Sequence, residues 1–186
     1  ATVGDPPADV DYMGVGFEGD IDGEFSVYGT GADIWGGCDS TFYAYNSQQI
    51  LPGNFDISYT LEDFYSQNGE STAEWGRAGL MIRDSVDCRD PVQFLGVSLR
   101  GYPTDPEDDM RRMIHSSRDR RNVGFARHEM LDIQLPVQLR LVRENNDFTS
   151  YYKLQTDGVW DEEWTMLGTR TSNIGCNALL GFAVSG

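Results

Sequence analysis

Residues 137–160 read VQLRLVRENNDFTSYYKLQTDGVW, and this stretch decides the fold class. Val137, Leu139 and Leu141 alternate with polar residues, and the second half of the stretch alternates in the same way. A period of two is typical of half-buried antiparallel strands. The letters ENND provide a hairpin turn, and the Asp-Gly pair that follows favours a type I′ turn. Residues 137 to about 167 are therefore predicted to form a meander.

Outward from this stretch, similar short runs recur, each bounded by Gly, Pro, Asn or Asp: 25–28, 42–45, 55–61, 78–83, 94–100, 123–126 and 179–184. About ten or eleven strands, without a convincing amphipathic helix, predict an all-β sandwich or barrel.

With 186 residues, the chain fits one domain. We expect an extended N-terminal arm at 1–11 and a single β-sandwich domain over 12–186. A polar insertion of both charge signs is predicted at about 103–121, as a long loop with one strand near 110–115.

The charge of the chain is strongly negative, since 30 Asp and Glu face 14 Lys and Arg for a net −16. Thirteen of the cations are Arg, and Lys153 is the single lysine. Nucleic acid is a poor partner for such a chain, because phosphate binding requires a basic surface. Three explanations of the acidity stay open: a salty habitat, calcium, and surface solubility.

Four fragments in order carry a family resemblance: GDIDGEFSVYGTGADIWGGCDSTFYAYN, WGRAGLMIRDS, PVQLRLVREN with DGVW, and LLGFAVSG. Together they resemble the laminin-G-like, concanavalin-A-like jelly-roll domains related to the enolase-regulation protein family, from about Gly16 to the C-terminus. The resemblance implies a two-sheet antiparallel jelly roll. Such domains are commonly accessory modules of secreted or cell-surface proteins and are often associated with carbohydrates. The cysteines and the arginine-rich insertion depart from the family pattern.

Sugar binding usually needs an exposed aromatic face beside polar groups. Trp164 and Tyr102 are the candidates for such a platform, while Trp35 is interpreted as a packing residue at a turn. Arg111 and Arg112 are candidates for bidentate contacts to a sulfated or uronic polysaccharide. They suit the acidic face of a neighbouring subunit equally well.

A structural calcium ion is a further expectation, because loops rich in Gly and Asp provide the oxygens that Ca²⁺ prefers. Its candidate ligands are Asp20, Asp22, Asp33 and Asp39, although each of these residues is also a common turn former. Glu18, Asp20 and Asp22 also alternate as the acids of jelly-roll glycosidases do. The third acid is Asp where those enzymes use Glu, so we expect no enzyme.

Cys38, Cys88 and Cys176 allow three single disulfides, and the sequence leaves the pairing open. No apolar run approaches the ~20 residues that span a bilayer, so we expect no membrane insertion. The N-terminal Ala with a Pro- and Asp-rich start, and the cysteines, favour an extracellular or cell-surface location.

The sequence favours two alternative functions. The first is a non-catalytic extracellular module that binds a polysaccharide or glycan, with a structural calcium. The alternative is a self-assembling subunit of a surface layer or filament, joined through the N-terminal arm and the arginine-rich loop.

Overall fold

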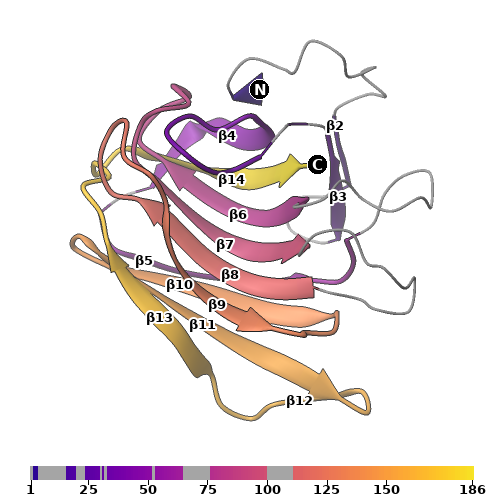
Figure 1. Cartoon of the computed structure of the whole chain (residues 1–186). Helices are drawn as coiled ribbons and strands as arrows, with labels where there is room; N and C mark the ends of the chain where they lie inside the picture. Colours follow the sequence, from indigo (N-terminus) through magenta and orange to yellow (C-terminus); the bar gives the residue numbers. More distant parts are fainter. Residues whose placement is uncertain are drawn as a thin grey trace.

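A computed structural model describes residues 2–3, 16–19, 24–29, 31, 33–51, 53–64, 76–99 and 111–186. These residues form strands and no helix, so this part of the chain has no helix able to cross a membrane. Twelve strands form two antiparallel sheets that pack as a sandwich, and a further hairpin stands beside them (Figure 1). The predicted all-β, two-sheet antiparallel sandwich is confirmed.

The larger sheet has seven strands in the order β1 (Thr2–Val3), β4 (Thr41–Leu51), β14 (Ala178–Ser185), β6 (Arg77–Arg83), β7 (Val92–Leu99), β8 (Arg111–Arg118) and β9 (Ala126–Leu131). The smaller sheet has five: β5 (Phe55–Leu61), β10 (Val137–Glu144), β11 (Asp147–Thr156), and β12 (Val159–Trp160) and β13 (Thr165–Thr171), which both pair with β11. The separate hairpin joins β2 (Gly16–Gly19) and β3 (Phe25–Tyr28).

The main hydrophobic core lies between the two sheets. The alternating apolar residues Val137, Leu139 and Leu141 of β10 pack there against Leu80 and Leu95 of the larger sheet. The predicted meander is present, because β10, β11 and β13 are joined in order by antiparallel pairing. Asp157 and Gly158 both have positive φ, as a type I′ turn requires.

A polar group also sits in this inner layer. The fully buried His115 of β8 lies with Nδ1 2.8 Å from Ser150 Oγ of β11, and with Nε2 2.9 Å from Gln93 Oε1 of β7. Burial lowers the pKa of His115 to about 3. The imidazole is therefore neutral at physiological pH and links the two sheets by hydrogen bonding.

A second apolar cluster lies on the outer side of the larger sheet. It contains Met81, Phe94 and Ile114 of the sheet, together with Ile34 from residues 33–40. We call residues 33–40 the cover segment, because they close over this outer side. With both sides packed, every residue of β6 and seven of the eight residues of β8 are buried.

Within the polar insertion predicted at 103–121, the strand predicted near 110–115 is present as the buried strand β8. The loop predicted after it is wrong for 116–118, which continue the strand, and residues 103–110 lie outside the described residues. Two arginines of β8, Arg112 and Arg118, are buried and form ion pairs with Glu129 and Asp39. The strand predicted at 123–126 instead begins at Ala126, and Phe125 before it stacks on Trp35. Of the predicted arm, Thr2–Val3 pairs with β4 of the same chain, and residues 4–11 lie outside the described residues.

Candidate functional site

The outer side of the smaller sheet is open, in contrast to the covered side of the larger one. Along β5 the burial alternates between half-buried and exposed, and along β10 between buried and half-buried. The outward residues are mostly polar, which the period-two pattern of these strands dictates. We call this outer side of β5, β10, β11 and β13 the open face.

Strand register aligns the outward residues in rows that run across the sheet. Ser58 of β5 lies opposite Arg140 of β10, which lies opposite Tyr151 of β11. Met166 of β13 continues this row. A second row contains Thr60, Gln138 and Lys153 in the same strand order. Directly opposite side chains are the closest neighbours in a sheet, so each row is a continuous strip of surface.

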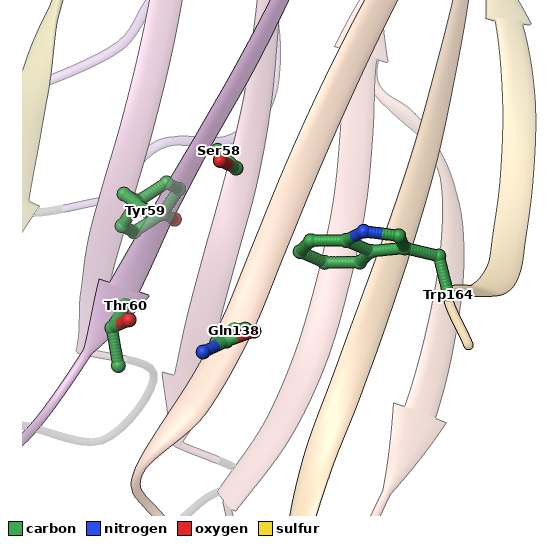
Figure 2. Close-up of a pocket in the computed structure, with 5 residues that line it drawn as sticks. All are labelled: Ser58, Tyr59, Thr60, Gln138 and Trp164. Atoms are coloured by element: carbon green, nitrogen blue, oxygen red, sulfur yellow. The ribbon is translucent and has the colours of Figure 1, made fainter. Parts of the chain in front are cut away.

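Trp164 precedes β13, and its indole ring lies back over the strands on the side of Gln138 (Figure 2). The guanidinium carbon of Arg140 is 5.7 Å from the ring centroid, and Lys153 Nζ is 5.4 Å from it. Cation–π contacts at such distances favour one ring position. Lys153 is itself held by a hydrogen bond to the Glu162 carbonyl oxygen. Two cations therefore fix the tryptophan on the open face.

A shallow depression of about 220 Å³ lies beside this ring. It is lined by Ser58, Tyr59, Thr60, Gln138 and Trp164 (Figure 2). The Tyr59 side chain belongs to the inner layer, where its hydroxyl donates to the Leu95 carbonyl oxygen at 2.6 Å. The side chains that border the depression from outside are therefore two hydroxyls, one amide and one indole.

Arg140 is held on the open face by an ion pair and by contacts with aromatic rings. Its Nε and Nη2 donate to Asp56 Oδ1 and Oδ2 at 2.7 and 2.5 Å, which is a bidentate ion pair. The hydrogen bond from Arg140 lowers the pKa of Asp56, and the same bond raises the pKa of Arg140. Its guanidinium carbon also lies 5.5 Å from the Tyr151 ring centroid. The guanidinium therefore lies close to two aromatic rings, Tyr151 and Trp164.

The arginines predicted to bind a ligand are in β8. Arg112 is 3% exposed and donates to Glu129 Oε2 at 3.1 Å, and Arg111 is half-buried at the start of the strand. The structure places neither on the open face with Trp164. Tyr102, the other predicted aromatic platform, lies outside the described residues.

Two of the predicted calcium ligands engage arginines. The fully buried carboxylate of Asp39 pairs with Arg83 and with Arg118, the latter at 2.7 Å, and both guanidiniums are fully buried too. Asp33 lies 3.2 Å from Arg77 Nε. Asp20 and Asp22 lie outside the described residues. Among the residues that the structure describes, no three His, Cys, Asp or Glu side chains form a metal-binding group. The calcium site stays a prediction.

Of the three possible disulfides, the structure forms Cys38–Cys88 and leaves Cys176 exposed as a free thiol. The bond fastens the cover segment to the loop between β6 and β7. Trp35 of the cover segment is 39% exposed and stacks on Phe125 with ring centroids 5.7 Å apart, and its interpretation as a packing residue stays a prediction.

Comparisons with known proteins identify the fold alone. No known protein family and no curated protein matches the sequence. A structure described as a functionally unknown protein from Saccharomyces cerevisiae is similar with a TM-score of 0.60 and 11% identity, over 99% of this chain and 85% of that one. A glycoside hydrolase of family GH43_12 from a capybara gut metagenome is similar with a TM-score of 0.53 and 14% identity. That match covers 91% of this chain but only 30% of the hydrolase chain.

Proposed function

We propose that the protein is a non-catalytic carbohydrate-binding module whose binding surface is the open face. The observation that carries the proposal is the position of Trp164, an indole fixed by two cations beside a shallow polar depression. An aromatic face packs against the apolar side of a sugar ring, while hydroxyl, amide and guanidinium groups bind its hydroxyls. The face offers all of these groups.

The lining of the depression favours binding without chemistry. Hydrolysis of a glycosidic bond uses a pair of carboxyl groups on either side of the scissile bond. The five residues that line the depression include no carboxyl group, imidazole or thiol. Asp56, which is nearby, has both of its oxygens engaged by Arg140.

Two further observations support the proposal. The fragments that resemble laminin-G-like and enolase-regulation domains suggest a family of accessory modules, and one similar structure is part of a glycoside hydrolase chain. The Cys38–Cys88 disulfide is compatible with an oxidising compartment, such as the extracellular space that we propose as the location.

The proposal is tested by affinity electrophoresis and pull-down of the pure protein with a panel of soluble and insoluble polysaccharides. Wild-type protein is expected to be retained by at least one of them, and Trp164→Ala is expected to abolish retention. Trp35→Ala is the matched control, because Trp35 is also partly exposed but lies on the covered side. Equal retention of wild type and Trp164→Ala would show that the open face is not the binding surface.

The alternative, self-assembly through the arm and the arginine-rich loop, stays a prediction. Two observations weigh against it. Thr2–Val3 pairs with β4 of its own chain, and Arg112 and Arg118 are engaged inside the fold. Light scattering with calcium and then with chelator distinguishes the functions. Large assemblies that persist without calcium would favour the subunit, and a monomer whose melting temperature falls on chelation would favour a calcium-bearing module.

A further inference from the structure

The two rows of the open face run at right angles to the strands. From Ser58 and Thr60 on β5, polar groups continue through Gln138 and Arg140 to the Trp164 ring. Neighbouring strands are about 4.8 Å apart, so the four strands β5, β10, β11 and β13 present a strip about 14 Å long. A strip of this length accommodates several linked sugar rings.

Both cations along the strip are already engaged within the chain. Arg140 is neutralised by Asp56, which is 51% exposed, and Lys153 binds a carbonyl in the acidic turn 161–163. The whole chain carries −16, so a polyanion approaching this face meets net repulsion. The face therefore suits an uncharged ligand with many hydroxyl groups.

Arg140 has donors left for such a ligand. A guanidinium carries five N–H groups in a fixed plane, and the pair with Asp56 uses Nε and one N–H of Nη2. The remaining three N–H groups belong to Nη1 and Nη2, and the guanidinium carbon lies 5.5 and 5.7 Å from the Tyr151 and Trp164 ring centroids. Because Asp56 already fixes the guanidinium, little side-chain entropy is lost when a ligand binds.

We infer that the open face takes an internal stretch of a neutral polysaccharide running across the strands, with Arg140 as the hydrogen-bond donor at its centre. This inference rests on the proposed function and names its substrate class and its specificity-determining residue. Trp164 supplies the stacking surface, and Arg140 sets the orientation of the hydroxyls against it.

The test is affinity electrophoresis in gels that contain neutral polysaccharides (xylan, glucomannan, β-glucan, galactan) or acidic ones (polygalacturonate, alginate, heparan sulfate). Wild type is expected to be retarded by at least one neutral polymer and by none of the acidic ones. Arg140→Gln and Arg140→Lys are both expected to weaken this binding at least tenfold, because neither side chain reproduces the planar fork. Arg127→Gln is the control, since Arg127 also lies over a tryptophan ring, that of Trp35.

Binding to an internal stretch of the polysaccharide is tested by calorimetric titration with oligosaccharides. These are cut from the polymer that retards the protein in the gel. Affinity is expected to rise over the first few sugar units and to be unaffected by reduction of the terminal sugar. Tight binding of an acidic polymer, a disaccharide that binds as tightly as the polymer, or full binding by Arg140→Gln would overturn the inference.

These failures are distinct from failure of the proposed function. If Trp164→Ala loses binding while both Arg140 variants keep it, the carbohydrate-binding function stands and the role of Arg140 is refuted. If no polymer retards the wild type, both fall together. Arg140 and Asp56 are partly exposed, so folding of the variants is expected to survive and is checked by their melting temperatures.

Discussion

The two outer sides of the sandwich use charged residues in opposite ways. On the covered side, Asp39, Arg83 and Arg118 are all fully buried, and their ion pairs close the cover segment over an apolar cluster. On the open face, Asp56 and Arg140 form a similar bidentate pair that stays half exposed. The buried ion pairs hold the cover segment where water is excluded, whereas the exposed pair stays accessible to the ligand that we propose.

The largest loss of stability is expected from Asp39→Asn on the covered side. Removing the carboxylate leaves two buried guanidiniums without a negative partner, which is expected to lower the free energy of unfolding by about 3–5 kcal/mol. Urea denaturation monitored by tryptophan fluorescence measures it. A loss below about 1 kcal/mol, the value typical of exposed pairs, would show that the covered side is not held by these ions.

Removing the disulfide is the next largest change. The cysteines are 50 residues apart, and the double substitution Cys38→Ser with Cys88→Ser is expected to lower the free energy of unfolding by about 2–4 kcal/mol. Polysaccharide affinity of the folded variant is expected to be unchanged, because Trp164 lies on the other side of the sandwich. A folded variant with weakened binding would mean that the two sides are coupled.

The buried His115 allows the stability contribution of the inner layer to be measured apart from that of the cover segment. The folded state holds it neutral, with a pKa of about 3, whereas in the unfolded chain it takes up a proton below pH 6.5. The unfolded state thus binds more protons, and stability falls as pH decreases from 6.5 toward 3, on the order of 2 kcal/mol by pH 5. Denaturation of the wild type and of His115→Gln at several pH values isolates the pH dependence of stability that His115 causes. A constant difference between them across pH 5–7 would refute it.

The smallest effect on stability is expected from Asp56→Asn. This exposed carboxylate contributes about 0–1 kcal/mol to folding, so the melting temperature is expected to change little. Polysaccharide affinity is expected to fall two- to tenfold, because Arg140 loses the partner that orients it. A variant that binds as the wild type does would show that the ion pair has no part in recognition.

The sequence predicted the open face better than the covered side. On β5, β10 and β11 the apolar residues alternate with polar ones, and this pattern by itself gives the strands, their inward residues and the outward position of Arg140. Trp164 was identified as a candidate because it does not stand where the resembling family has framework aromatic residues. Arg140, Gln138, Ser58 and Thr60 were missed, although each occupies an outward position of a predicted strand.

The covered side was harder to predict because it depends on contacts between distant segments. A strand buried on both sides carries no alternation, so the sequence indicated only part of β8, and its buried arginines were interpreted as part of a polar insertion. The partners of Asp39 are 44 and 79 residues away in sequence, and no local pattern marks an aspartate as the centre of an ion cluster. The sequence therefore left Asp39 as a candidate calcium ligand or a turn former, because Ca²⁺ sites are also built from aspartates in glycine-rich loops.

The most direct test of the account is an NMR titration of the four tryptophan indole N–H signals with the polysaccharide that retards the protein. The signals are assigned by single Trp→Phe substitutions. If the open face binds the polysaccharide, the Trp164 signal shifts with ligand concentration while the Trp35 signal stays in place. A shift of Trp35 without a shift of Trp164 would contradict the account and would place binding on the covered side.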